Sequence, residues 1–179
     1  PHRDWIQDNI LNPAYYGVCL TPAMIVERIG ARFSIYGTAP RIATDWRWHK
    51  SLHGENLRFN ENFLESYYAT AHNFVDHTVL LPPRPAAENR MLENECWSLI
   101  AAGAEWERAG CGDTLPLIAA IEHIADDIRG FAPVAYEAIN EFHALFRRAR
   151  PDTRAVAEMG AFGRLFGREN LYVSLCRDG

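Results

Sequence analysis

Hydrophobic residues in the middle of the chain recur every three to four positions, which is the period of an amphipathic α-helix. Four stretches have this pattern, at about 57–78, 86–109, 117–128 and 132–149. Asp113 or Thr114 is the expected N-cap of the third stretch, and a shorter helix is expected after Asp152. Because the connections between the four stretches are short, the sequence favours an antiparallel helical bundle.

Two segments on either side of this helical region alternate between apolar and polar residues, which is typical of a β-strand. They lie near 32–36, where Gly37 is expected to end the strand, and near 171–176. A short helix is expected before the first strand, with Thr21 as its N-cap and Gly30 at its end. The two strands should pair antiparallel, because a lone strand leaves its backbone groups unpaired and the sequence has no third strong strand signal.

The expected fold class is therefore α+β and predominantly α, with a four- or five-helix bundle bracketed by a small antiparallel β element. The chain has 179 residues, of which 48% are hydrophobic, and this is enough for one domain with its own core. We expect a single domain over 1–179, in which 57–149 form the helical bundle and 1–44 and 168–179 form the loop and αβ elements.

The charge balance argues against nucleic acid as a partner. The net charge is −5, whereas proteins that bind phosphate backbones have a net basic surface or stripe. The short basic run at 147–150 is better explained as cations at the C-terminal end of a helix. No apolar run reaches the roughly 18 residues of a membrane span. The sequence predicts a cytoplasmic protein that binds neither nucleic acid nor membrane. Because the chain begins at Pro1 without an initiator methionine, we also expect it to be a piece of a longer polypeptide.

The four cysteines lie far apart in the sequence and form no CxxC pair. We expect Cys19, Cys96, Cys111 and Cys176 to be free, mostly buried thiols of a reducing compartment. None of them has a neighbouring histidine that would stabilise a thiolate, so a cysteine nucleophile is not expected.

The segment 44–50, Thr-Asp-Trp-Arg-Trp-His-Lys, is the most informative stretch for function. It places two indoles, two cations, a carboxylate and an imidazole in seven residues, and Lys50 is the one lysine of the chain. In an extended segment Trp46 and Trp48 would share one face, with Asp45, Arg47 and His49 on the other. Either the two tryptophans dock an amphipathic strand or loop on the core, or they line a polar pocket.

Two histidine and aspartate pairs raise the question of a metal site. His72 and Asp76 lie four residues apart on one predicted helix, as do His123 and Asp127 on another, so each pair can share a helix face. Two such pairs facing each other could chelate a divalent metal in a bundle. The sequence favours solvated pairs instead, because His123 and Asp127 flank the apolar stripe of their helix. No metal is therefore expected.

The order of these features resembles the C-terminal part of a class I S-adenosylmethionine-dependent methyltransferase. The features are Pro1-His2-Arg3-Asp4-Trp5, a loop with Asn12-Pro13, a helix from Thr21-Pro22, a strand ending Ile35-Tyr36-Gly37, and a last strand at 171–176 followed by Arg177. In that family the sixth and seventh strands form an antiparallel pair, and substrate-recognition elements are often inserted between them. The resemblance makes 31–36 the sixth strand, 171–176 the seventh, and the bundle at 57–149 the insertion.

The resemblance also implies a cofactor, a substrate and site residues. The family binds S-adenosylmethionine with an acidic-Gly-x-Gly loop, which this sequence lacks, so the cofactor is expected to bind the parent protein and not this chain alone. Asp45 or His49 would orient or deprotonate the acceptor group of a small-molecule substrate. The expected substrate-binding residues are Tyr16, Trp46 and Trp48, which would exclude water, and Arg47 and Lys50, which would hold an anionic group.

The expected partners besides the substrate are an upstream domain of the same polypeptide or a second copy of the chain. Two other functions fit the same pattern. One is a non-catalytic helical module that binds a partner protein through the bundle. The other is a metal-dependent helical-bundle enzyme.

Overall fold

The computed structural model describes residues 20–39, 41–42, 59–74, 80–147, 153–163 and 172–177. Its elements, in chain order, are α2 (Pro22–Ile29), β1 (Phe33–Ala39), α4 (Phe59–Thr70), α5 (Ala86–Arg108), α6 (Leu115–Ile128), α7 (Pro133–Phe146), α8 (Thr153–Ala157) and β2 (Tyr172–Arg177). The predicted class, a predominantly helical α+β fold with a small antiparallel sheet, is confirmed. None of the helices in the described part is both long and apolar enough to cross a membrane.

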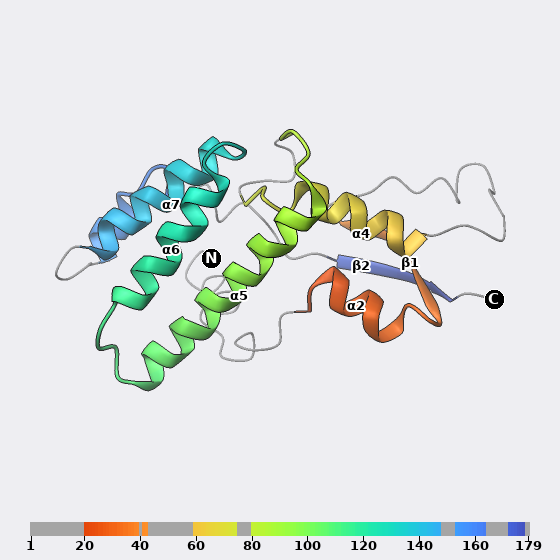
Figure 1. Cartoon of the computed structure of the whole chain (residues 1–179), viewed down its shortest axis with the longest axis horizontal. Helices are drawn as coiled ribbons and strands as arrows, with labels where there is room; N and C mark the ends of the chain where they lie inside the picture. Colours follow the sequence, from red (N-terminus) through yellow and green to blue (C-terminus); the bar gives the residue numbers. More distant parts are fainter. Residues whose placement is uncertain are drawn as a thin grey trace.

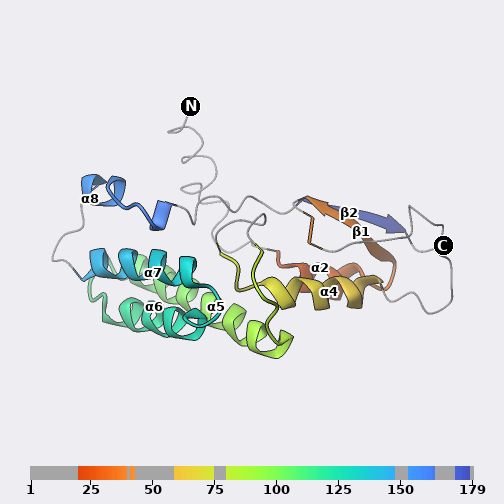
Figure 2. The ribbon, with the colours of Figure 1, turned by 90° about the horizontal axis from the view of Figure 1, so that it is seen from above.

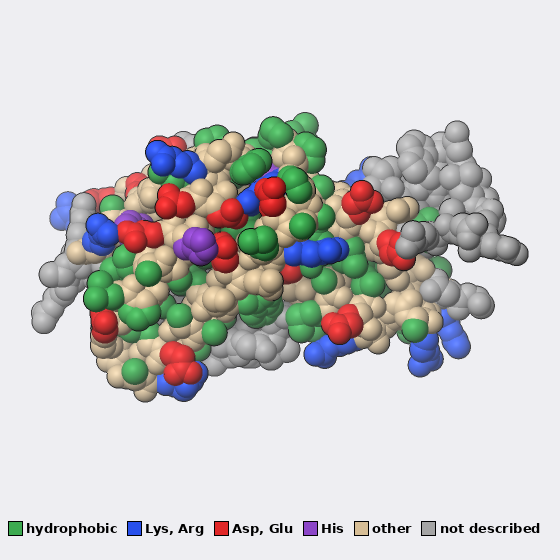
Figure 3. Space-filling view, viewed as in Figure 1, with side chains coloured by type: hydrophobic (Ala, Val, Ile, Leu, Met, Phe, Trp, Pro, Cys, Tyr) green, Lys and Arg blue, Asp and Glu red, His purple; other side chains and the backbone are tan. Residues whose placement is uncertain are grey.

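The elements form two groups along the long axis of the molecule (Figures 1 and 2). Helices α5, α6 and α7 pack side by side in one group, while α2, α4 and the sheet form the other. Helix α4 contacts α2 and β1 as well as α5, so it joins the two groups. In the space-filling view of Figure 3, charged side chains of both signs are interspersed among apolar ones over the described part of this face.

The core of the first group lies where α5, α6 and α7 meet. It consists of Leu92 from α5, Ile124 and Ile128 from α6, and Ala132 and Ala135 at the start of α7. The branched side chains each contribute about 1.5–3 kcal/mol by their burial. The two alanines let α7 turn back closely against α6, which explains why three residues are enough to separate α6 from the N-cap of α7.

Helix α2 begins and ends where the sequence predicts. The Thr21 side chain accepts a hydrogen bond from the Met24 amide at 3.3 Å, and Pro22 stands in the first turn, where its missing amide hydrogen has no cost. Gly30 ends the helix and donates its amide hydrogen to the Val26 carbonyl. A Cβ atom at Gly30 would collide with the Val26 carbonyl oxygen, so the turn into β1 favours glycine.

The connection between α5 and α6 follows the Schellman pattern. Gly110 has a φ of +80°, its amide donates to the Glu107 carbonyl, and the amide of Cys111 reaches the Trp106 carbonyl. Asp113 and Thr114, the two residues expected to cap α6, both lie at its start. Thr114 is the N-cap, but the Asp113 carboxylate accepts the hydrogen bond from the first turn, at 3.0 Å from the Leu115 nitrogen.

Helix α4 ends at Thr70, earlier than the predicted end near 78. Ala71 and Asn73 continue as a turn, held by the Tyr68 and Thr70 carbonyls, and His72 points into the protein with no exposed surface. The apolar pattern of the sequence extends to Phe74 although the helix has already ended. Phe74 is apolar because it packs against the core of the first group. Residues 75–79 lie outside the described part.

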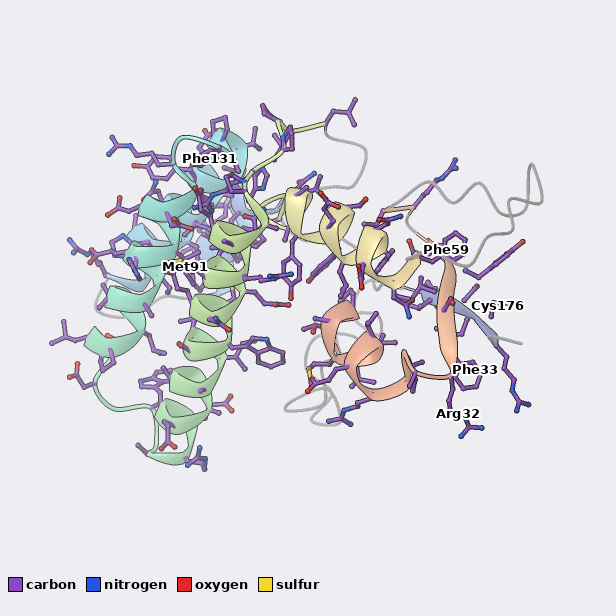
Figure 4. All side chains as sticks on the ribbon, turned by 45° about the vertical axis from the view of Figure 1, so that its right-hand side comes forward. Arg32, Phe33, Phe59, Met91, Phe131 and Cys176 are labelled. Atoms are coloured by element: carbon purple, nitrogen blue, oxygen red, sulfur yellow. The ribbon has the colours of Figure 1, made fainter. Side chains whose placement is uncertain are left out.

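The two strands pair antiparallel, as predicted, although more than 130 residues separate them in the sequence. Ile35 faces Leu175 and Gly37 faces Ser174, so Tyr36 is an additional residue that forms a bulge. Figure 4 shows Phe33 and Cys176 on the adjacent strands. The prediction that Gly37 ends β1 is wrong, because the strand continues beyond the bulge to Ala39.

The two edges of this sheet differ. The outer edge of β1 is covered by α4, where the Asn60 side chain accepts from the Ile35 amide at 2.8 Å and donates to the Phe33 carbonyl at 3.0 Å. Asn60 thereby pairs with two backbone groups on this edge of β1. The other edge of the sheet belongs to β2, which pairs with no further strand among the described residues. Tyr172 and Leu175 on β2 are 69% and 44% exposed.

The segment after α7 is held by one carboxylate. Glu141 accepts hydrogen bonds from the backbone amides of Gly160 and Phe162, at 3.0 and 2.7 Å. The rings of Phe142 and Phe162 stack with their centroids 4.6 Å apart. These contacts place the segment that contains α8 against α7.

Candidate functional site

The residues to which the sequence assigns a site lie outside the described part of the chain. These residues are Tyr16, Asp45, Trp46, Arg47, Trp48, His49 and Lys50. Just before segment 44–50, the Thr38 hydroxyl accepts a hydrogen bond from the Ile42 amide at 3.2 Å. The assignment of Asp45 and His49 as catalytic residues and of the others as substrate-binding residues therefore stays a prediction.

Within the described part, the polar side chains with the most contacts converge on Arg84. This residue lies in the segment 80–85, which returns from the end of α4 to the start of α5, and its backbone amide donates to the Ala69 carbonyl at 3.0 Å. Arg84 is only 5% exposed. Arginine side chains are rarely buried to this extent unless their charge is paired. Pro82, Pro83 and Pro85 surround it in the sequence and restrict the backbone of the segment.

The Arg84 guanidinium binds two carboxylates and an aromatic ring. Its two terminal nitrogens donate to the two Asp127 oxygens at 2.8 and 2.6 Å, and Nε donates to Glu88 at 2.9 Å. Its carbon atom lies 4.6 Å from the centre of the Phe131 ring. The hydrogen bonds to Asp127 raise the pKa of Arg84 further above its usual value, against the opposing effect of burial. Segment 80–85 is thereby attached to both α5 and α6.

The network continues from Arg84 to Asn89 and His72, both fully buried. The Asn89 oxygen accepts from Arg84 at 3.4 Å, while the amide nitrogen of Asn89 donates to the Tyr68 carbonyl and faces Nδ1 of His72 at 3.0 Å. Nε2 of His72 lies 3.1 Å from the Pro82 carbonyl oxygen. The Arg84 network therefore links α4, segment 80–85, α5 and α6. Figure 4 shows Phe131, whose ring covers the Arg84 guanidinium, at the turn after α6.

This arrangement is suited to holding elements together and not to proton transfer. Both oxygens of Asp127 accept hydrogen bonds from Arg84. The side-chain oxygen and nitrogen of Asn89 are also both hydrogen-bonded, to Arg84 and to the Tyr68 carbonyl. A general base needs an accessible lone pair within reach of a substrate, and the buried ring of His72 offers none to solvent. We therefore interpret the Arg84 network as structural.

A second polar cluster joins α4 to α5. The hydroxyl groups of Tyr68 and Tyr67 donate to the two Glu93 oxygens, at 2.8 and 3.4 Å, and the Arg90 guanidinium lies 4.7 Å from the centre of the Tyr68 ring. Burial, and then the hydrogen bond and the charge of Glu93, raise the pKa of Tyr68 to about 12. Tyr68 therefore acts as a hydrogen-bond donor at neutral pH and not as a base.

The histidine and aspartate pairs do not act as pairs. Asp127 is bound to Arg84, and His123, whose side chain is 71% exposed, faces Glu95 on α5 at 3.1 Å. His72 belongs to the buried network, and Asp76 lies outside the described part. Among the described residues, no three or more of histidine, cysteine, aspartate and glutamate come together in a way that could hold a metal ion.

The cysteines differ from the expectation in their exposure. Cys111 and Cys176 are exposed and Cys96 is partly buried, whereas the sequence predicted mostly buried thiols, and Cys19 lies outside the described part. Cys111 lies in the α5–α6 turn, with a φ of +59°. Burial, assisted by the charge of Glu95, raises the pKa of Cys96 to about 11, so the thiolate needed for nucleophilic attack is scarce at neutral pH.

Sequence reasoning did not identify Arg84 and Asn89. The signal that was present is an arginine enclosed by three prolines and followed four residues later by Glu88, a spacing that suits an ion pair at the start of a helix. Asp127, 43 residues away, could not be connected with it from the sequence. In comparisons with known proteins, no family model, no curated protein and no solved structure matches this chain.

Proposed function

We propose that this chain is the substrate-recognition and C-terminal portion of a small-molecule methyltransferase that uses S-adenosylmethionine. The observation that carries the proposal is the antiparallel pairing of β1 with β2, with all of α4 to α8 between them in the sequence. This is the order expected for the sixth and seventh strands of the class I fold with a helical insertion, preceded by a helix, here α2.

The difference between the two sheet edges supports the proposal. A two-stranded sheet is at best marginally stable by itself, and an open edge invites a further strand. Asn60 already pairs with the Ile35 amide and the Phe33 carbonyl on the β1 edge, so we expect the sheet to be extended beside β2. In the proposed protein, β2 pairs along that edge with the sheet of the cofactor-binding half, and Tyr172 and Leu175 become covered.

In this proposal segment 44–50 forms the acceptor side of the active site. The segment follows directly after β1, and residues at the C-terminal ends of strands are where open α/β sheets bind their ligands. Asp45 or His49 orients or deprotonates the acceptor group, and Arg47 and Lys50 hold an anionic part of the substrate. The aromatic residues Tyr16, Trp46 and Trp48 exclude water from the reacting groups.

Cofactor binding tests the proposal directly. Calorimetry should find no binding of S-adenosylmethionine to the 179-residue chain tighter than about millimolar, about −4 kcal/mol, because the glycine loop is missing. The full reading frame that contains this chain should bind the cofactor in the micromolar range. Failure of the full-length protein to bind S-adenosylmethionine would contradict the proposal.

Substitutions then test the site in the full-length protein. Asp45→Asn and His49→Gln should lower the rate of methyl transfer by about 10²–10⁴-fold if the residue acts as the base. Asp126→Asn and His123→Gln, at exposed positions on α6, are the matched controls and should leave the rate unchanged. Equal rates for all four variants would remove Asp45 and His49 from the mechanism.

The described surface of the helices offers little support for a protein-interaction module. Met91 and Ile100 are exposed apolar residues of α5. They are nine residues apart in the sequence, so they lie on opposite faces of the helix. Leu115, at the start of α6, is a third such residue. Single exposed apolar side chains are normal on protein surfaces and do not indicate a binding site.

A further inference from the structure

Segment 80–85 brings several exposed apolar residues together outside the helices. Its sequence is Leu-Leu-Pro-Pro-Arg-Pro, and Figure 1 shows it as a yellow-green loop before α5. Four of its six residues are exposed: Leu80, Pro82, Pro83 and Pro85. Leu80 has 93% of its surface in solvent. Exposed apolar residues that cluster in this way point to contact with another molecule.

The prolines favour a polyproline II backbone in this segment. The ring of a proline fixes its φ at about −65°, and the residue before a proline is restricted to extended conformations. Every residue from Leu81 to Pro85 is either a proline or stands directly before one. Pro85 has a φ of −52° and a ψ of 130°, close to the polyproline II values of about −75° and +145°.

Burial along the segment repeats with the three-residue period of a polyproline II helix. Leu81 packs against the core of the first group, and Arg84, three residues later, is buried. These two side chains form the edge that faces the protein. The remaining residues are exposed on the other two edges: Leu80 with Pro83, and Pro82 with Pro85.

The inward edge holds the segment in place. The Arg84 guanidinium pairs with Asp127 on α6 and with Glu88 on α5, and the Arg84 backbone amide donates to the Ala69 carbonyl. The segment is therefore ordered before any partner binds. Binding to a segment that is already ordered costs little conformational entropy.

Polyproline II segments are recognised by grooves lined with aromatic side chains. We propose that segment 80–85 is a preformed ligand for such an aromatic groove on a partner protein. Because Arg84 faces inward and its charge is paired there, the partner reads the proline and leucine side chains and not a charge. This interaction is independent of the proposed methyl transfer, which is assigned to segment 44–50.

The first test titrates the ¹⁵N-labelled 179-residue chain with a panel of purified SH3 and WW domains, which bind polyproline II through aromatic grooves. At least one domain should bind more tightly than about millimolar. It should shift the amide signals of Leu80, Leu81 and Arg84, since the prolines have no amide hydrogen. The same domain with a groove tryptophan replaced by alanine should not bind. If no domain shifts these signals, or if the tryptophan variant binds equally well, the proposal is overturned.

Substitutions on the outward edges test whether the partner reads this segment. Leu80→Ser and Pro83→Ala should each weaken the binding of that domain by about tenfold or more, because each removes an apolar anchor. Pro116→Ala, at an exposed proline in the first turn of α6, is the matched control and should leave the affinity unchanged. Because Leu80 is almost fully exposed, Leu80→Ser decides even if Pro83→Ala alters the fold. Equal affinities for all three variants would contradict the proposal.

A synthetic peptide of residues 80–85 with blocked ends tests whether the fold presents the segment in its bound conformation. The folded chain should bind the domain several-fold more tightly than the peptide does, because the peptide must be ordered on binding. Equal or tighter binding by the peptide would mean that the ligand is not preformed, contrary to the proposal.

Discussion

Arg84 is stable inside the protein because its guanidinium donates four hydrogen bonds. Two carboxylates and a side-chain amide accept its hydrogen bonds, and an aromatic ring covers one face. Arginine suits this position better than lysine, because its planar fork binds both oxygens of Asp127 at once. Without Arg84, the buried Asn89 oxygen would lose this hydrogen-bond partner, whereas water can reach Asp127 and Glu88, whose side chains are 27% and 45% exposed.

Arg84→Met should therefore lower the free energy of unfolding by about 2–3 kcal/mol, as measured by urea denaturation. Arg154→Met is the matched control. Arg154 pairs with Glu158 at the same 2.9 Å that separates Arg84 from Glu88, but its side chain is 86% exposed. Its loss should change the free energy of unfolding by no more than about 1 kcal/mol. Similar losses for both variants would mean that burial does not determine the strength of these pairs.

Tyr68 allows a prediction at alkaline pH. Its pKa of about 12 in the folded chain lies above the value of about 10 for an unfolded tyrosine, so above pH 10 the unfolded state loses the proton first. The stability that this group contributes is complete below pH 10 and is lost as the pH rises toward 12.

Denaturation at pH 9 and pH 11 measures this effect. Tyr68→Phe, which cannot ionise, should lose less stability between the two pH values than the unaltered chain does. Tyr172→Phe, at an exposed position of β2, should behave like the unaltered chain. An identical alkaline loss in the Tyr68→Phe variant would contradict the assignment of the raised pKa to Tyr68.

At the scale of single residues, the sequence identified the groups that stand in local patterns. Thr21 and Gly30 were found because a helix start and a helix end depend on residues next to each other. Arg84, Asn89 and Asp127 were not found as a group, because their contact depends on how α5 and α6 pack. The candidate residues of segment 44–50 lie outside the described part.

At the scale of the elements, local signals predicted where helices start better than where they end. The end of α4 at Thr70 has no glycine or proline signal, and His72 just beyond it is buried against Pro82 and Asn89 from later parts of the chain. The sequence predicts that β1 ends at Gly37, but the strand continues through this residue after a bulge. A glycine in a strand can mark either event, and the sequence alone does not distinguish them.

Asn60 allows a prediction about the contact between α4 and the sheet. Asn60→Ala removes both hydrogen bonds to β1 and leaves the Ile35 amide and the Phe33 carbonyl without this partner. The free energy of unfolding should fall by about 2 kcal/mol, because each hydrogen bond contributes about 1 kcal/mol. Hydrogen exchange of the Ile35 amide should become faster.

Asn62→Ala, at an exposed position two residues further along α4, is the control for the change in helix propensity. It should leave both the stability and the Ile35 exchange rate unchanged within error. If the two variants exchange the Ile35 amide equally fast, the Asn60 side chain does not cover the β1 edge in solution.

At the scale of the whole molecule, α4 is the element that keeps the two groups in one body. Its last turn contributes the Tyr68 carbonyl to the Arg84 network, and its first turn contributes Asn60 to the sheet. A substitution in the network at one end of α4 is therefore expected to affect the orientation of the sheet at the other end. The sequence predicted the strand pairing because only two strand patterns were present, but it contained no sign of this linking role.

The coverage of β1 by Asn60 also limits how copies of this chain can associate. Because α4 blocks one side of the sheet, two copies that meet through β2 have no second edge left for a third copy, and the assembly is self-limiting at a dimer. Gel filtration of the 179-residue chain at rising concentration should thus reach a dimer and no larger species.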